Sequence, residues 1–366
     1  MIRNIFFALL SMTMSTAVVA QSNYKEGSNS LARYMQSNDI KDLEAAKKFT
    51  DAAYKTRRDS SNARNNILRA MIYSSLAYAD STRKIKSDKD HILVAKHAVD
   101  RLRRKDKDRF SNELNYITQN LTAAYMYKAN QELSAKKYTE AYQSYLEVYK
   151  LGTNTEAVIY NLAQLASQAN KLDEAIGYQT QIIKDTDADA DKYLELADLY
   201  KRKKDMQSYL TTLETARAKF MDNKQILFQL VEIYGENKSY SAIVPIIDQA
   251  LQFEPENQEL IYLAGYANEN EGNIGRAKQY YQRLNELDNN NYSANLALGL
   301  IFLDDFLRNS SNLEAQYNAQ NYLLRANEIK PHDISALKGL AMYYKAVGDD
   351  SQLDRVNLQL NQLSNK

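Results

Sequence analysis

Residues 156–189, EAVIYNLAQLASQANKLDEAIGYQTQIIKDTDAD, contain the pattern that decides the fold of this chain. The first half has apolar residues at i, i+3, i+4 and i+7, the spacing of one helix face: Ile159, Leu162, Ala163 and Ala166. The pattern stops at Asn170, and a second amphipathic helix is expected from Leu172 onward. Neither helix can bury its apolar stripe alone, so neighbouring units must stack against each other.

The same unit recurs along the chain with a fixed period of 34 residues. A column of mostly small residues keeps this step: Ala129, Ala163, Ala197, Val231, Gly265 and Gly299. A second column marks the expected start of the second helix: Tyr138, Leu172, Met206, Tyr240 and Ile274. Small side chains in the first column would let the two helices of a hairpin approach closely. A constant period of this length predicts an all-α solenoid of antiparallel helix hairpins.

These columns resemble the tetratricopeptide repeat (TPR) from about Leu121 to the end of the chain. The first and second helices of each TPR hairpin are called helix A and helix B. The TPR consensus has an Ala near the start of helix B, which is matched by Ala141, Ala175, Ala277 and Ala319. It also has a later small residue, a Pro after helix B and a Gly between the helices, matched by Ala216, Ala250, Ala326, Pro255, Pro331, Gly272 and Gly348. In two units Tyr209 and Ile243 occupy the position of this helix B Ala, and the sequence contains no Trp. The resemblance implies a right-handed superhelix of TPR-like hairpins.

The amino terminus has the pattern of a secretory signal peptide over residues 1–20. Arg3 precedes an apolar run, and small residues stand before a cleavage site at Gln21. The chain has no Cys, which excludes disulfides and a lipid-anchoring cysteine. We therefore expect a periplasmic or secreted protein with no transmembrane segment after signal removal, similar to exported proteins of the Bacteroidetes.

Two segments follow the expected signal peptide. Residues 21–110 are predicted to form two degenerate hairpins, with a charged break over 105–109, and residues 111–366 to form the TPR array. The small column jumps by 42 residues from Gly299 to Ala341, so residues 304–312 should be a protruding loop or a lengthened helix. A polar-faced final helix over 351–363 is expected to cap the array.

Charge is distributed unevenly along the chain. Residues 24–110 hold 21 Lys+Arg and 12 Asp+Glu, whereas residues 111–366 hold 25 Lys+Arg and 34 Asp+Glu. The densest basic run supplies a candidate patch: Arg101, Arg103, Arg104, Lys105, Lys107 and Arg109. It is either a solvated helix end or a docking patch for an acidic protein or for lipid phosphates.

Catalytic and cofactor motifs are missing from the sequence. No paired His motif, Gly-rich phosphate loop or Gly-x-Ser-x-Gly elbow occurs, so we expect no enzyme, no metal site and no cofactor. A formal net charge of +1 and the export signal disfavour nucleic acid. Most of the 28 tyrosines fit the repeat core, where the ring packs and the hydroxyl reaches the rim.

A binding face is implied by the TPR resemblance, because helix A residues line the concave groove of such repeats. The matching positions are Asn130, Tyr160, Gln164, Asp198, Phe228, Glu232, Tyr262 and Tyr266. The first hypothesis is a non-catalytic scaffold of the cell envelope that binds a peptide or protein there. The alternative is a glycan- or nutrient-handling accessory protein, although such proteins usually have exposed Trp and a lipid-anchoring Cys.

The groove is expected to prefer a basic or neutral partner. Some TPR domains grip a carboxylate with Lys, Asn and Arg; here Asn130 and Asn161 occupy the Asn positions of that clamp. The positions that need cations hold Met126, Asp191 and Glu195. Further helix A carboxylates, expected to lack counter-ions, would repel an acidic segment: Asp198, Glu232, Glu236, Glu259 and Glu269.

Overall fold

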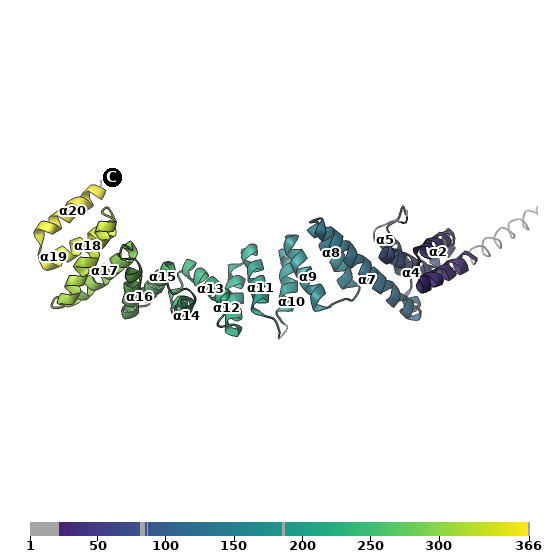
Figure 1. Cartoon of the computed structure of the whole chain (residues 1–366), viewed down its shortest axis with the longest axis horizontal. Helices are drawn as coiled ribbons and strands as arrows, with labels where there is room; N and C mark the ends of the chain where they lie inside the picture. Colours follow the sequence, from purple (N-terminus) through teal and green to yellow (C-terminus); the bar gives the residue numbers. More distant parts are fainter. Residues whose placement is uncertain (1–21, 81–84, 86, 185–186, 365–366) are drawn as a thin grey trace, which may run out of the picture. The chain divides into compact units, whose positions relative to one another are not determined.

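The computed structural model describes residues 22–80, 85, 87–184 and 187–364. The expected signal peptide, residues 1–20, lies outside the described residues. The described residues are helical or lie in turns and loops, and no strand occurs among them. The chain divides into two compact units, residues 1–188 (unit 1) and 189–366 (unit 2), which are described separately. Within each unit consecutive helices pack as antiparallel hairpins, the arrangement of an α-solenoid (Figure 1).

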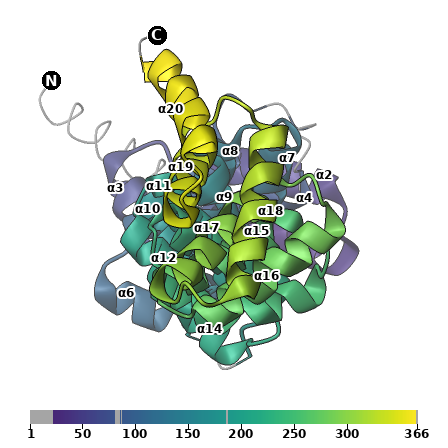
Figure 2. The same ribbon diagram turned by 90° about the vertical axis from the view of Figure 1, so that its left-hand side faces the viewer.

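Unit 1 begins with a helix over residues 22–37. Its longer helices are α2 (Ile40–Ala52), α4 (Ala63–Ala79), α5 (His91–Asp100), α7 (Ser111–Ser134), α8 (Tyr138–Lys150), α9 (Glu156–Gln168) and α10 (Leu172–Ile182). The first helix contacts α2 through the Arg33–Asp42 ion pair, and α4 packs against α5. Two short helices, α3 (Arg57–Ser61) and α6 (Arg104–Arg109), lie at the left-hand edge of Figure 2.

The expected charged break over residues 105–109 is wrong, because these residues belong to α6. Helix α5 also ends at Asp100, before the basic run. The backbone N–H groups of Asp106 and Lys107 donate to the Arg103 carbonyl, so this charged segment forms a helical turn. High charge density excludes burial of a segment, but it does not by itself exclude a solvated helix.

A buried cation joins α2 to α4 in unit 1. Arg69 is only 5% exposed, and its guanidinium lies 4.6 Å from the ring centroids of both Tyr54 and Tyr73. Its Nη1 pairs with a carboxylate oxygen of Asp51 at 2.6 Å, and the Tyr73 hydroxyl donates to the same carboxylate at 2.9 Å. The carboxylate partner and the two rings compensate the burial of this charge.

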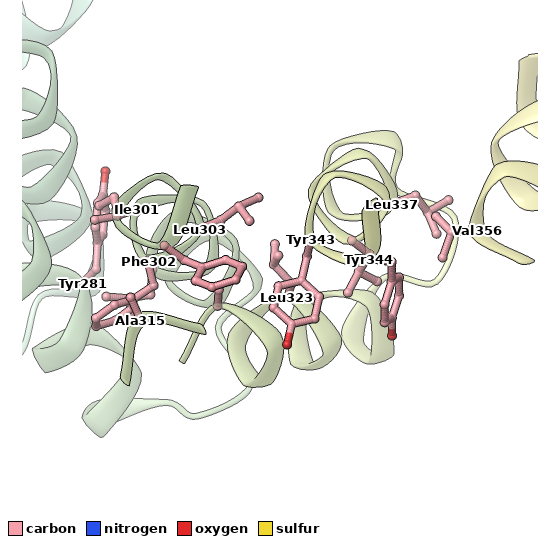
Figure 3. Packing of buried hydrophobic residues seen from close by; sticks show 14 of the residues in the cluster. Tyr281, Ile301, Phe302, Leu303, Ala315, Leu323, Leu337, Tyr343, Tyr344 and Val356 are labelled. Atoms are coloured by element: carbon pink, nitrogen blue, oxygen red, sulfur yellow. The ribbon is translucent and has the colours of Figure 1, made fainter. Parts of the chain in front are cut away.

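Unit 2 contains ten helices in its described residues. They are α11 (Ala190–Lys203), α12 (Met206–Lys219), α13 (Lys224–Glu236), α14 (Tyr240–Phe253), α15 (Gln258–Asn270), α16 (Ile274–Leu287), α17 (Tyr292–Arg308), α18 (Leu313–Ile329), α19 (Ile334–Val347) and α20 (Asp350–Ser364). Side chains from α16 to α20 form one continuous apolar cluster. Figure 3 shows Tyr281, Leu323 and Tyr343 among its members.

The small column is buried and sets the distance between helices. Ala129, Ala163 and Ala197 are at most 2% exposed. A Cβ added at Gly265 would lie 2.6 Å from the Tyr281 ring, and one added at Gly299 would lie 2.8 Å from Leu323 Cγ. Both distances are far below van der Waals contact, so the prediction that this column permits close helix approach is confirmed.

The second column also matches the structure. Tyr138, Leu172, Met206, Tyr240 and Ile274 are each the first residue of their helix. The turn before each of these helices contains a residue in the left-handed region, again every 34 positions: Lys136, Asn170, Lys204, Lys238 and Gly272. The A helices of unit 2 have side-chain caps with the same period: Asp189, Asn223, Asn257 and Asn291. The period therefore fixes the turns as well as the core.

The 42-residue step is absorbed mainly by lengthened helices. Helices α17 and α18 each have 17 residues, whereas α15 has 13 and α16 has 14. This is the lengthened-helix form of the prediction for residues 304–312. The last described helix, α20, packs through a stripe that includes Leu353, Val356 and Leu360, while its other face is polar. In the described part of the chain, no helix combines the length and apolarity that crossing a membrane requires.

Candidate binding groove

A groove of about 680 Å³ lies between α13 and α15, the A helices of two successive hairpins in unit 2. Its apolar lining comes from four side chains: Phe228, Val231, Leu260 and Leu263. Two of the candidate binding residues from the sequence, Phe228 and Glu232, line this groove. Leu260 and Leu263 were not predicted from the sequence. A repeat column marks one face of a single A helix, whereas the groove is lined by the facing sides of two A helices, α13 and α15.

Carboxylates dominate the charge of this groove. Glu232, Glu236 and Glu259 line it and are exposed, and Lys224 is the one cation of the lining. The Lys224 Nζ lies 3.0 Å from a carboxylate oxygen of Glu254 and 5.2 Å from the centroid of the Phe228 ring. The lining therefore combines an apolar floor with a negative rim.

The expectation that helix A carboxylates lack counter-ions is wrong at two positions. Lys201 Nζ lies 3.7 Å from Glu232, and Arg202 Nη1 lies 3.8 Å from Asp198. Lys201 belongs to α11, the A helix before that of Glu232, and Arg202 lies one turn after Asp198 on α11. A repeat column alone does not reveal such neighbours. Pairs this long and this exposed contribute little and can exchange for another cation. Glu236 and Glu259 form no ion pair with any residue that the structure describes.

Tyr209 lies close to the carboxylates beside the α13–α15 groove. Its ring is buried, and its hydroxyl donates to Gln229 Oε1 at 3.3 Å. Burial, followed by the nearby charges of Glu232, Glu236 and Asp198, raises the pKa of Tyr209 to about 12. Asp198 on α11 therefore belongs to the same electrostatic environment as the rim glutamates of α13, although it does not line the groove.

Two predicted tyrosines form an exposed stack on α15. The rings of Tyr262 and Tyr266 have centroids 6.0 Å apart at an interplanar angle of 13°, and these residues are 37% and 38% exposed. Tyr240 of α14 meets the Tyr266 ring edge-on at 5.3 Å. Burial, followed by the charges of Tyr266 and Glu269, raises the pKa of Tyr262. The pair does not line the groove, but it shares α15 with Leu260 and Leu263.

The remaining predicted positions belong to unit 1. Asn130 is exposed on α7, Gln164 is half-buried on α9, and Tyr160 packs against the small cluster around Ile159. The amide of Asn161, the second clamp asparagine, donates to the Tyr145 hydroxyl at 3.4 Å. These residues are not part of the α13–α15 groove.

Every member of the candidate basic patch is exposed in unit 1. Arg103 Nε pairs with Asp106 at 3.1 Å, and the Arg109 guanidinium lies 5.2 Å from the Phe110 ring centroid. Over the residues that the structure describes, no group of three or more His, Cys, Asp or Glu is arranged to hold a metal ion.

Comparison with known proteins gives structural likeness only. No protein-family model matches the chain, and no curated protein matches it. The similar solved structures include the C-terminal part of a TPR repeat-containing protein from Cytophaga hutchinsonii, at 14% identity and a TM-score of 0.42 over 64% of this chain and 94% of that one. YrrB, described as a TPR protein with an unusual peptide-binding site, has 18% identity and a TM-score of 0.39 over 53% and 96%. MamA has 16% identity and a TM-score of 0.36 over 47% and 93%. Likeness at these scores carries no inference about function.

Proposed function

We propose that this chain is a non-catalytic protein-interaction scaffold, and that the α13–α15 groove holds an extended segment of a partner protein. The observation that supports the proposal is the combination of an apolar floor, including Phe228 and Leu263, with rim carboxylates at Glu236 and Glu259. Such a groove suits a segment with an apolar side chain for the floor and a Lys or Arg close beside it. A segment with carboxylates at that point would meet like charges.

The cell envelope is part of the same proposal. It is supported by the charged, apolar and small-residue pattern of residues 1–20 and by the absence of Cys from the sequence. The partner would then be another envelope protein with a basic or neutral segment.

Titration with matched peptides tests the groove. Two peptides would share one central apolar residue, and its neighbours would be Lys in one peptide and Glu in the other. We expect the basic peptide to bind more tightly, and its affinity to fall as salt rises, because exposed charges are screened over a Debye length of about 8–10 Å. Tighter binding of the acidic peptide would contradict the proposal.

A matched pair of variants separates the groove from general charge. The triple variant Glu232→Gln, Glu236→Gln and Glu259→Gln removes the rim charge. We expect it to lower the affinity for the basic peptide by about tenfold. The control removes three exposed carboxylates of unit 2 that do not line the groove, at Glu256, Glu271 and Glu314. Equal loss in both variants would show that net charge, not the groove, determines binding.

A glycan is the second candidate ligand, favoured by the exposed Tyr262–Tyr266 stack. Aromatic rings of this kind provide flat apolar surfaces for ligands, although Tyr is also common in protein interfaces. Competition with soluble glycans distinguishes the two candidates. Displacement of the basic peptide by glycan, together with loss of glycan binding in Tyr262→Ala, would favour the glycan role.

A further inference from the structure

A strongly basic surface of unit 1 has no role in the proposed groove. It combines the candidate patch with α3 and the start of α4, because Arg101 Nη1 donates to the Ser60 carbonyl of α3 at 3.4 Å. We call this the α3–α6 basic surface, and its cations are Arg57, Arg58, Arg64, Arg101, Arg103, Arg104, Lys105, Lys107 and Arg109. All nine are exposed. Figure 2 shows α3 and α6 on the same side of the view.

Little within unit 1 neutralises these cations. The Asp59 carboxylate accepts from the Thr56 N–H and hydroxyl in a capping box, and Asp106 pairs with Arg103. Over the described residues, Arg103 is the one cation of this surface that forms an ion pair, and the other eight form none: Arg57, Arg58, Arg64, Arg101, Arg104, Lys105, Lys107 and Arg109. Only Asp100 and Asp108 add further exposed carboxylates in this segment. The surface therefore has a net positive charge that an external partner can neutralise.

We propose that the α3–α6 basic surface docks on an anionic lipid bilayer through headgroup phosphates. Seven of its nine cations are Arg, whose planar guanidinium binds phosphate with two parallel hydrogen bonds. None of the large apolar side chains that the structure shows to be exposed lies on this surface. A protein interface normally needs aromatic or aliphatic anchors, whereas adsorption to a charged bilayer does not.

The charge of the rest of the chain fits the same inference. Residues 111–366 hold 34 Asp+Glu against 25 Lys+Arg, so an anionic bilayer attracts the first part of the chain and repels the remainder. The bilayer would not attract the α13–α15 groove, because the groove is acidic. The inference does not depend on what the groove binds.

Vesicle co-sedimentation of the mature full-length chain tests the proposal. The chain should sediment with vesicles containing phosphatidylglycerol, should stay in solution with pure phosphatidylcholine vesicles, and should be released by high salt. Arg104→Glu with Lys105→Glu and Lys107→Glu should weaken partitioning by about a hundredfold, because each cation near an anionic surface contributes separately.

The control reverses three exposed cations of unit 2, at Lys238, Lys338 and Lys345, which gives the same change in net charge. This variant should partition like the wild type, and the helical circular dichroism of both variants should match it. Failure to bind the anionic vesicles, or equal loss in both variants, would overturn the proposal. Displacement from vesicles by a soluble Glu-rich peptide at lower concentration than by lipid headgroup would instead assign the surface to an acidic protein. Peptide binding in the α13–α15 groove is measured separately, so failure of one proposal does not entail failure of the other.

Discussion

Single small residues determine how closely the repeat helices pack. Ala163 is 2% exposed and Ala197 is fully buried, and each lies in the column whose glycines touch the neighbouring helix. At Gly299 an added Cβ would also lie 3.1 Å from the backbone nitrogen of Leu323, so side-chain rotation cannot relieve the contact. The column is therefore a steric requirement of the hairpin.

Enlarging a member of this column should destabilise the fold. We expect Ala163→Leu and Ala197→Leu to lower the free energy of unfolding by about 1–3 kcal/mol, because overpacking forces the helices apart. The measurement is thermal or urea unfolding followed by circular dichroism. Gln168→Leu, at an exposed position of α9, is the control and should change stability little. Equal melting of all three variants and the wild type would mean that the assigned repeat register is wrong.

The Asp51–Arg69 pair predicts a pH dependence of unit 1. Burial raises the pKa of Asp51, but hydrogen bonds and charge from Arg69, with Tyr73 and Lys47, outweigh it and lower the pKa overall. A carboxylate with a depressed folded-state pKa stabilises the fold above its unfolded pKa, about pH 4, and loses this contribution as pH falls further. Unfolding should therefore become easier below about pH 4.

Asp51→Asn tests this assignment. We expect it to lower stability by about 1–2 kcal/mol at neutral pH and to reduce the change in stability on acidification. The measurement is the unfolding midpoint at neutral and acidic pH. Asp42→Asn removes a more exposed pair with Arg33 and should have a smaller effect. An unchanged acid response in Asp51→Asn would contradict the assigned role.

At the scale of the elements, the 34-residue period also dictates the turns. Lys136, Lys204 and Lys238 adopt positive φ between the two helices of their hairpins, where Gly272 stands in the next unit. A non-glycine residue is strained in this conformation, and glycine is preferred just after a helix. These lysines therefore lower the free energy of unfolding relative to glycine at the same positions.

Replacing one of them with glycine should stabilise the fold. We expect Lys204→Gly to raise the free energy of unfolding by about 0.5–1 kcal/mol, because it relieves the left-handed strain. The neighbouring variant Lys203→Gly changes the last residue of α11, where the backbone is helical, and should lower stability. Unfolding midpoints of the two variants should thus move in opposite directions. Movement in the same direction would show that the turn is not as described.

The regular array could be predicted from the sequence because its period repeats the same local chemistry. The small column and the first residues of the second helices followed from spacing. Spacing also placed extra residues before Ala341, but it left open whether they form a loop or lengthen a helix. The helix α6 could not be separated from a charged break, because its residues bury nothing. The pairs of Glu232 and Asp198 were missed because the Lys201 and Arg202 side chains are long and reach beyond the repeat columns. The groove depends on two helices at once, so only part of its lining was found.

At the scale of the whole molecule, export is the prediction that the described residues leave untested. The pattern of residues 1–20 predicts cleavage before Gln21 and a mature chain in the periplasm or medium. Intact-mass analysis of protein purified from its native envelope should show a chain that begins at Gln21. A mass that includes Met1 would contradict this expectation.

We expect the two units to bind their partners independently. Unit 1 presents the α3–α6 basic surface, and unit 2 contains the groove with its carboxylate rim. Charge reversal on one surface should leave binding at the other unchanged, because each interaction is local and screened by salt.

The most direct test of the central proposal locates the bound peptide. Hydrogen–deuterium exchange would be measured for the full chain with and without a saturating basic peptide that has one apolar anchor. Binding in the groove predicts slower exchange in α13 (Lys224–Glu236) and α15 (Gln258–Asn270), and no change in α18 (Leu313–Ile329). Slower exchange confined to helices outside α13 and α15 at saturation would contradict the account.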